Sequence, residues 1–170
     1  LWGAEDPYVE IGQGTDGWPI PMGTLFHDAR TQVIYLATEI GGPCQFVALS
    51  LDVRVIPGQT MNNWTIRMKH TPLSSYPATP SWESANWTTV HQSNATVSST
   101  GWNTFNFSVP FDYNGVDNLM VDFSFNNDSR SSSGQVRYSV PGGVRSIYYR
   151  TNSAWGDPLS WSGPSNPTPT

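Results

Sequence analysis

Four tryptophans stand among proline, glycine and aspartate, and they are the residues of this chain best suited to contact a ligand. They are half of the eight tryptophans in 170 residues. Their settings are Asp-Gly-Trp18-Pro, Pro-Ser-Trp82-Glu, Trp155-Gly-Asp-Pro and Trp161-Ser-Gly-Pro. Burying one indole is worth roughly 4–6 kcal/mol. Rings left on loops are therefore expected either to close the ends of a core or to meet a ligand.

A flat ring on a stiff loop suits the apolar C–H face of a sugar, and nearby carboxylates can bond the sugar hydroxyls. We therefore predict a carbohydrate site with Trp82 and Trp155 as its main contacts, followed by Trp18 and Trp161. Glu83 and Asp157 are the predicted polar partners because each lies beside one of these rings in the sequence. The alternative is that each indole plugs an open end of the core.

Signals for catalysis are weak. The one tight cluster of mixed ionisable groups runs from His27 to Arg30. Adjacent strand residues face opposite ways, so a base at His27 oriented by Asp28 is awkward. A turn in which Arg30 pairs with a carboxylate is the favoured interpretation. The few glutamates show no pairing typical of glycosidases, so we predict no enzyme; a polysaccharide lyase or hydrolase remains an alternative without an identified base.

Metal and cofactor motifs are equally sparse. The sequence contains no EF-hand loop, no His-Glu-X-X-His segment and a single cysteine, Cys44, which we expect to be buried. Glu39 ends an apolar run and is expected to need an arginine or Ca²⁺ as its partner. No cofactor is predicted with certainty. A structural Ca²⁺ on loop oxygens is an alternative whose ligands the residue spacing does not identify.

Apolar residues alternate with polar ones along most of the chain, which predicts half-buried strands. Segments 105–111 and 119–125 flank Asn114-Gly115 and are predicted to pair as a hairpin. Trp64 and Trp102 are expected in the core. Segment 31–40 fits a short helix or a strand, and its β-branched residues favour a strand.

These elements predict an all-β fold, an antiparallel β-sandwich of jelly-roll-like type. One domain is expected over residues 1–161, and residues 162–170 are expected to begin a Pro/Thr-rich linker.

The amino-acid composition argues against two classes of partner, nucleic acids and membranes. Charged residues make up 12% of the chain and its net charge is −5. Nucleic-acid binding requires clustered cations, so we predict no such partner. No apolar run is long enough to cross a bilayer, so no membrane partner is predicted either. A polar, weakly charged surface is typical of extracellular β proteins, and we expect a secreted module within a longer chain.

Three strings resemble β-sandwich accessory modules of large secreted bacterial proteins, in which such modules flank enzymes or adhesin repeats. The strings are 31–35 (TQVIY), 63–71 (NWTIRMKHT) and 110–119 (PFDYNG followed by DNL). The resemblance implies a carbohydrate-binding or adhesin-like module and transfers no catalytic residue. We therefore predict a non-catalytic module that binds polysaccharide by aromatic stacking. The alternative is a structural or adhesive surface module with no glycan ligand.

Overall fold

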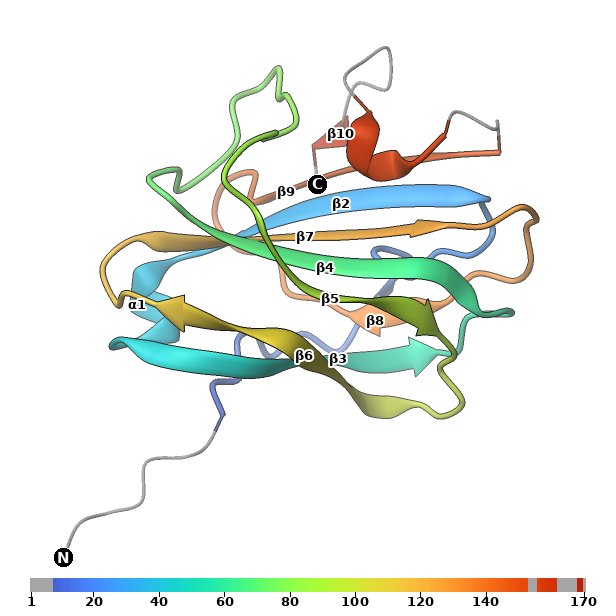
Figure 1. Cartoon of the computed structure of the whole chain (residues 1–170), viewed down its shortest axis with the longest axis horizontal. Coiled ribbons are helices and arrows are strands. Elements are labelled where there is room, and N and C mark those ends of the chain that lie inside the picture. Colours follow the sequence, from blue (N-terminus) through green and yellow to red (C-terminus); the bar gives the residue numbers. More distant parts are fainter. Residues whose placement is uncertain (1–7, 153–155, 162–167, 170) are drawn as a thin grey trace, which may run out of the picture.

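Two antiparallel sheets pack face to face in the computed structural model, which describes residues 8–152, 156–161 and 168–169 (Figure 1). The four-stranded sheet has the order β1 (Gly17–Trp18), β8 (Gln135–Arg137), β3 (Cys44–Val55) and β6 (Gly101–Tyr113). The six-stranded sheet has the order β10 (Thr168–Pro169), β9 (Ser146–Thr151), β2 (Asp28–Tyr35), β7 (Asn118–Asn126), β4 (Met61–Thr71) and β5 (Thr88–Ala95). The predicted all-β antiparallel sandwich is confirmed.

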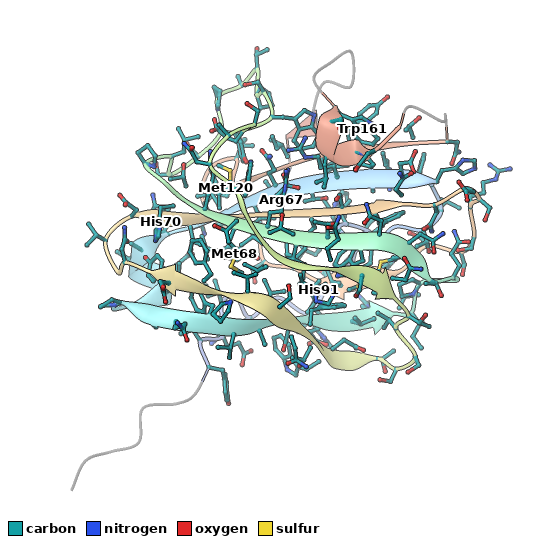
Figure 2. All side chains as sticks on the ribbon, in the orientation of Figure 1. Arg67, Met68, His70, His91, Met120 and Trp161 are labelled. Atoms are coloured by element: carbon teal, nitrogen blue, oxygen red, sulfur yellow. The ribbon has the colours of Figure 1, made fainter. Side chains whose placement is uncertain are left out.

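Alternation along each strand determines what enters the core between the sheets. In β4, Trp64, Ile66 and Met68 are buried in the core, whereas Arg67 lies on the opposite side of the strand (Figure 2). The Trp64 ring packs on Phe105 of one sheet and Phe123 of the other, at centroid distances of 5.5 and 5.8 Å. Trp64 is therefore a core residue, as predicted.

The predicted hairpin between segments 105–111 and 119–125 is wrong. β6 pairs with β3 in the four-stranded sheet, and β7 pairs with β2 and β4 in the other sheet. The alternation nevertheless identified the core-facing residues of both strands, which are Phe105, Phe107 and Phe111 of β6 and Leu119, Val121, Phe123 and Phe125 of β7. Alternation shows which face of a strand must be buried. It does not show whether two strands are neighbours in one sheet or face each other across the sandwich, so alternation alone does not specify pairing.

Segment 31–40 contains both of the structures that its sequence allowed. The strand prediction is confirmed as far as Tyr35 and wrong after it, because α1 (Ala37–Ile40) is helical. The Asn118 side chain accepts a hydrogen bond from the Ala37 N–H at 2.8 Å, and Glu39 accepts one from the Leu36 N–H at 2.8 Å. No helix in the described part of the chain is long and apolar enough to cross a bilayer.

The turn predicted from His27 to Arg30 is also wrong. β2 begins at Asp28 and pairs with β7 as far as Tyr35 on one side and with β9 as far as Val33 on the other. Two flanking strands satisfy the backbone of this segment, so it stays extended. The predicted carboxylate partner of Arg30 is nevertheless present, as described below.

The outer face of the six-stranded sheet is covered. Figure 1 shows the connection between β4 and β5, together with the 3₁₀-helix η1 (Pro158–Ser160), on the side of this sheet away from β3 and β6. As a result every residue of β7 from Leu119 to Phe125 is buried, including those that face outward. Of the predicted linker, β10 pairs with β9, and the other residues from 162 onward lie outside the described residues.

Candidate functional sites

A charged network lies beneath the cover of the six-stranded sheet. The fully buried Asp122 carboxylate accepts hydrogen bonds from Arg30 at 2.8 Å, from Arg67 at 2.6 Å and from Gln32 Nε2 at 2.9 Å. Arg30 is only 2% exposed. Two guanidinium groups thus share one carboxylate, and water does not screen the remaining positive charge.

Two tryptophans of the β4–β5 connection lie over these cations. The Arg30 guanidinium carbon lies 4.5 Å from the centre of the Trp82 ring, and Arg67 and Lys69 lie 5.1 and 5.2 Å from the Trp87 ring. The negative face of an indole stabilises a desolvated cation. Trp82, predicted as a main sugar contact, is therefore half-buried and holds the connection on the sheet.

Glu83 also holds the β4–β5 connection on the six-stranded sheet. Its carboxylate pairs with Lys69 Nζ at 2.7 Å, and its backbone carbonyl accepts hydrogen bonds from Gln32 Nε2 at 2.9 Å and Trp87 Nε1 at 3.0 Å. Each of these bonds fastens the connection to β2, to β4 or to itself.

The other predicted sugar contacts are dispersed. Trp161 is buried, and its ring meets Tyr149 edge-on at 5.4 Å. Asp157 accepts the Leu159 N–H at 2.9 Å and begins η1. Trp18 is 39% exposed beside Tyr138 on the four-stranded sheet, and Trp155 lies outside the described residues. The structure brings Trp82, Glu83 and Trp161 to one sheet face as its cover, with Trp18 in the other sheet.

Glu39 has the arginine partner that was expected for it. Two hydrogen bonds of 2.7 Å join its carboxylate to Arg145, which precedes β9. This hydrogen bonding lowers the pKa of Glu39 below its ordinary value of 4.5, since the charged form is favoured. The pair connects α1 to the segment that leads into β9.

The Glu39–Arg145 pair predicts a pH-dependent term in stability. A lowered folded-state pKa contributes stability above the unfolded value, and that contribution is lost as the pH falls through the folded value. Glu39→Gln is expected to cost about 1–2 kcal/mol near pH 7. The difference from wild type should shrink toward zero as the pH is lowered below 4.5. Urea denaturation of both proteins across this range measures it, and a difference independent of pH would contradict the assignment.

A groove of about 870 Å³ runs beside the first half of β3. β8 pairs with β3 only at Val53 and Val55, so from Cys44 to Ser50 no described strand continues the four-stranded sheet on that side. Inner-face residues of the six-stranded sheet therefore line the groove, among them Tyr35, Leu119 and Val121. We call this cleft the β3 groove.

Polar and aromatic side chains line the β3 groove together with this apolar part: Tyr8, Glu10, Gln45, Ser50 and Trp102. Cys44 also lines it and is exposed, so the prediction of a buried cysteine is wrong. Because no strand of the described residues pairs with β3 on the groove side at this end, the first residues of β3 face solvent there.

Trp102 is 58% exposed, so its predicted place in the core is wrong. The core-facing residues of β6 are odd-numbered, with Phe105, Phe107 and Phe111 among them. Trp102 is even-numbered and pairs across the sheet with Asp52, without a register shift between it and Phe105. Strict alternation therefore turns its indole outward. That parity is visible in the sequence and was the available signal for this residue.

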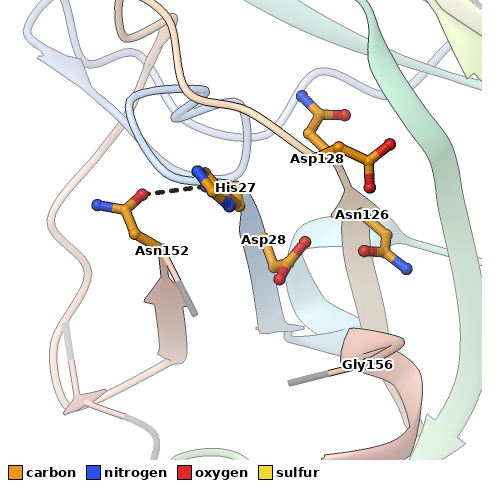
Figure 3. Close-up of a pocket in the computed structure, with 7 residues that line it drawn as sticks. His27, Asp28, Asn126, Asp128, Asn152 and Gly156 are labelled. Atoms are coloured by element: carbon orange, nitrogen blue, oxygen red, sulfur yellow. Dashed lines mark hydrogen bonds between the residues drawn. The ribbon is translucent and has the colours of Figure 1, made fainter. Parts of the chain in front are cut away.

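A second, smaller cleft lies where β2 begins. It has a volume of about 360 Å³ and is lined by polar residues: His27, Asp28, Asn126, Asn127, Asp128, Asn152 and Gly156 (Figure 3). His27 donates its backbone N–H to Asn152 Oδ1 at 3.3 Å. Among the described residues, no group of three or more His, Cys, Asp or Glu side chains is arranged to hold a metal ion. We call this cleft the Asp28 pocket.

Asp28 is the unusual group of this pocket. Burial raises its pKa to about 7, and the nearby carboxylates of Asp128 and Asp157 add to the rise, while the backbone of Asn127 opposes it. Half of the population would hold a proton near neutrality. Such a carboxyl could transfer a proton, whereas the hydrogen bond between His27 and Asn152 uses the backbone N–H of His27 and not its imidazole.

Comparison with protein-family models, with curated proteins and with solved structures finds no match to this chain. Functional inference therefore rests on the two clefts and on the side chains that line them.

Proposed function

We propose that this chain is a non-catalytic carbohydrate-binding module of a secreted multidomain protein, and that polysaccharide binds in the β3 groove. The observation that carries the proposal is the indole of Trp102, which is 58% exposed and lines the larger of the two clefts described above. An exposed ring of this size offers a rigid apolar surface on which the C–H face of a sugar can stack.

The polar side chains of the groove complement that surface. Gln45 donates to Asp112 Oδ1 at 2.8 Å, and Ser50 bonds Thr104 across the strands at 2.8 Å. Both pairs are exposed, so their amide and hydroxyl groups are oriented while remaining open to sugar hydroxyls. A largely preformed cleft with an apolar floor and a few placed polar groups is the usual form of a small-molecule site.

This proposal relocates the site predicted from the sequence. Trp82, Glu83 and Trp161 are engaged in covering the six-stranded sheet, so their rings and carboxylate have partners already. Trp18 keeps an exposed ring outside the β3 groove, which makes it a matched control for Trp102.

Trp102→Ala is expected to weaken polysaccharide binding by about thirtyfold, which corresponds to roughly 2 kcal/mol for loss of a central aromatic contact. Native gels that contain soluble glucans, xylans, mannans or galactans measure binding as retardation of the protein. Trp18→Ala should be retarded like wild type. Equal losses in the two variants, or none in Trp102→Ala, would contradict a site in the β3 groove.

The one cysteine of the chain offers an independent readout of the same site. Cys44 lines the β3 groove, so bound polysaccharide should slow its reaction with a maleimide. Conversely, a bulky maleimide adduct should abolish retardation in the gel. A labelling rate that is unchanged at a saturating glycan concentration would place the ligand elsewhere on the molecule.

A structural or adhesive module is the second candidate, and one observation favours it. Over 44–52, β3 has no described partner strand on the groove side, and the apolar residues Leu119 and Val121 lie beside that edge. An extended segment of another protein could add there as a strand. Binding to no polysaccharide in the panel would favour this candidate over the glycan proposal.

A further inference from the structure

We propose that the Asp28 pocket is a Ca²⁺ site, in which the carboxylates of Asp28 and Asp128 and the side-chain oxygen of Asn126 are ligands. The inference is independent of the β3 groove, which is lined by a different set of residues.

Asp28 carries the first part of the argument. It is 2% exposed, and its Oδ1 atom is buried without a hydrogen-bond partner. Buried polar atoms in folded proteins almost always have a partner, so an isolated carboxylate oxygen requires an explanation. In Figure 3 this carboxylate points into the pocket, toward the side on which Asn126 and Asp128 lie.

The charges around Asp28 are the second part. Asp128, a second carboxylate, lines the same pocket, and the carboxylate of Asp157 also lies near enough to repel the charge of Asp28. A bound divalent cation would favour the ionised form of these carboxylates, because it compensates their desolvation and their mutual repulsion.

The available ligands match calcium. Ca²⁺ accepts six to eight oxygens in flexible geometry, from carboxylates, amides, backbone carbonyls and water. Two carboxylates and one amide oxygen are enough side-chain ligands for Ca²⁺ when peptide oxygens and water complete the coordination shell. Mg²⁺ demands a stricter octahedron and gives up its waters reluctantly, so a pocket of mixed oxygens discriminates against it.

The scaffold of the proposed site is rigid. Asn127, which separates two of the proposed ligands, is 4% exposed. Its side chain accepts the Asn62 N–H at 2.7 Å and donates to the Thr60 carbonyl at 3.2 Å, and its backbone N–H donates to the His27 carbonyl at 2.9 Å. These bonds fix Asn126 and Asp128 relative to the start of β2, so a cation would find its ligands largely in place.

Titration of the EDTA-treated chain with CaCl₂ tests the proposal. Isothermal calorimetry should show one bound Ca²⁺, and 10 mM CaCl₂ should raise Tm by about 5 °C, as expected for a site with sub-millimolar affinity in a domain of this size. MgCl₂ at the same concentration should raise it by less than half as much. Asp28→Asn should lose the response to Ca²⁺, and Asp128→Asn should bind at least about tenfold more weakly.

Asp112→Asn is the matched control, because Asp112 is an exposed carboxylate on the four-stranded sheet. It should respond to Ca²⁺ like wild type. Asp128 is exposed, so Asp128→Asn should fold even if a change at buried Asp28 does not. The proposal is overturned if wild type shows neither heat of binding nor a shift of Tm, or if Asp128→Asn and Asp112→Asn bind Ca²⁺ equally well. Both readouts are independent of polysaccharide binding.

Discussion

Asp122→Asn is expected to lower the free energy of unfolding by about 3–5 kcal/mol, a large part of the stability of an ordinary domain. The substitution keeps the volume of the side chain but removes its charge. Arg30 and Arg67 would then share no counterion, although Arg30 is 2% exposed and Asp122 fully buried. A buried guanidinium without a partner is far more costly than the intact pair is favourable. Urea denaturation at neutral pH measures the loss.

An exposed ion pair supplies the control for Asp122. Arg137 and Asp52 approach to 3.0 Å, with 43% and 23% of their side chains exposed. Asp52→Asn should cost less than about 1 kcal/mol, because water screens such a pair. A cost for Asp122→Asn as small as that of Asp52→Asn would show that Trp82 and Trp87 stabilise the two guanidiniums without the carboxylate.

Trp64→Ala is expected to cost about 3–5 kcal/mol, whereas Trp102→Ala should change stability by less than about 1 kcal/mol. Trp64 is fully buried and touches an aromatic ring from each sheet, so its removal leaves a cavity that neither sheet can fill. The Trp102→Ala substitution removes an indole that is already largely in contact with water. Chemical denaturation of the two variants compares the same substitution in two environments.

Trp64→Phe refines this comparison. The Trp64 Nε1 atom is buried without a hydrogen-bond partner, so phenylalanine removes an unsatisfied donor along with some packing volume. We expect it to retain most of the stability lost in Trp64→Ala. Equal stability of Trp64→Ala and Trp102→Ala would contradict the assignment of Trp64 to the interior.

The candidate sites were less predictable from the sequence than the fold. Loop position made Trp82 and Trp161 the expected sugar contacts, but a loop can fold back over a sheet. Here the outer face of the six-stranded sheet presents Arg30, Arg67 and Asp122. Two indoles of the β4–β5 connection lie against the two guanidinium groups and cover them. Asp28 was identified in the sequence only as part of a charged cluster, because its unpartnered oxygen arises from burial.

The alternation of apolar residues determined by itself that this chain is an antiparallel sandwich, since a strand with one apolar face requires a second layer to bury it. It also determined that Trp64 lies inside and, when the parity of β6 is followed strictly, that Trp102 lies outside. Only the tertiary structure decided that β6 and β7 belong to different sheets, that β3 has no described partner strand along its groove edge, and which tryptophans are covered. Those outcomes depend on contacts between residues far apart in the chain. Local sequence patterns carry no information about which distant segments come into contact.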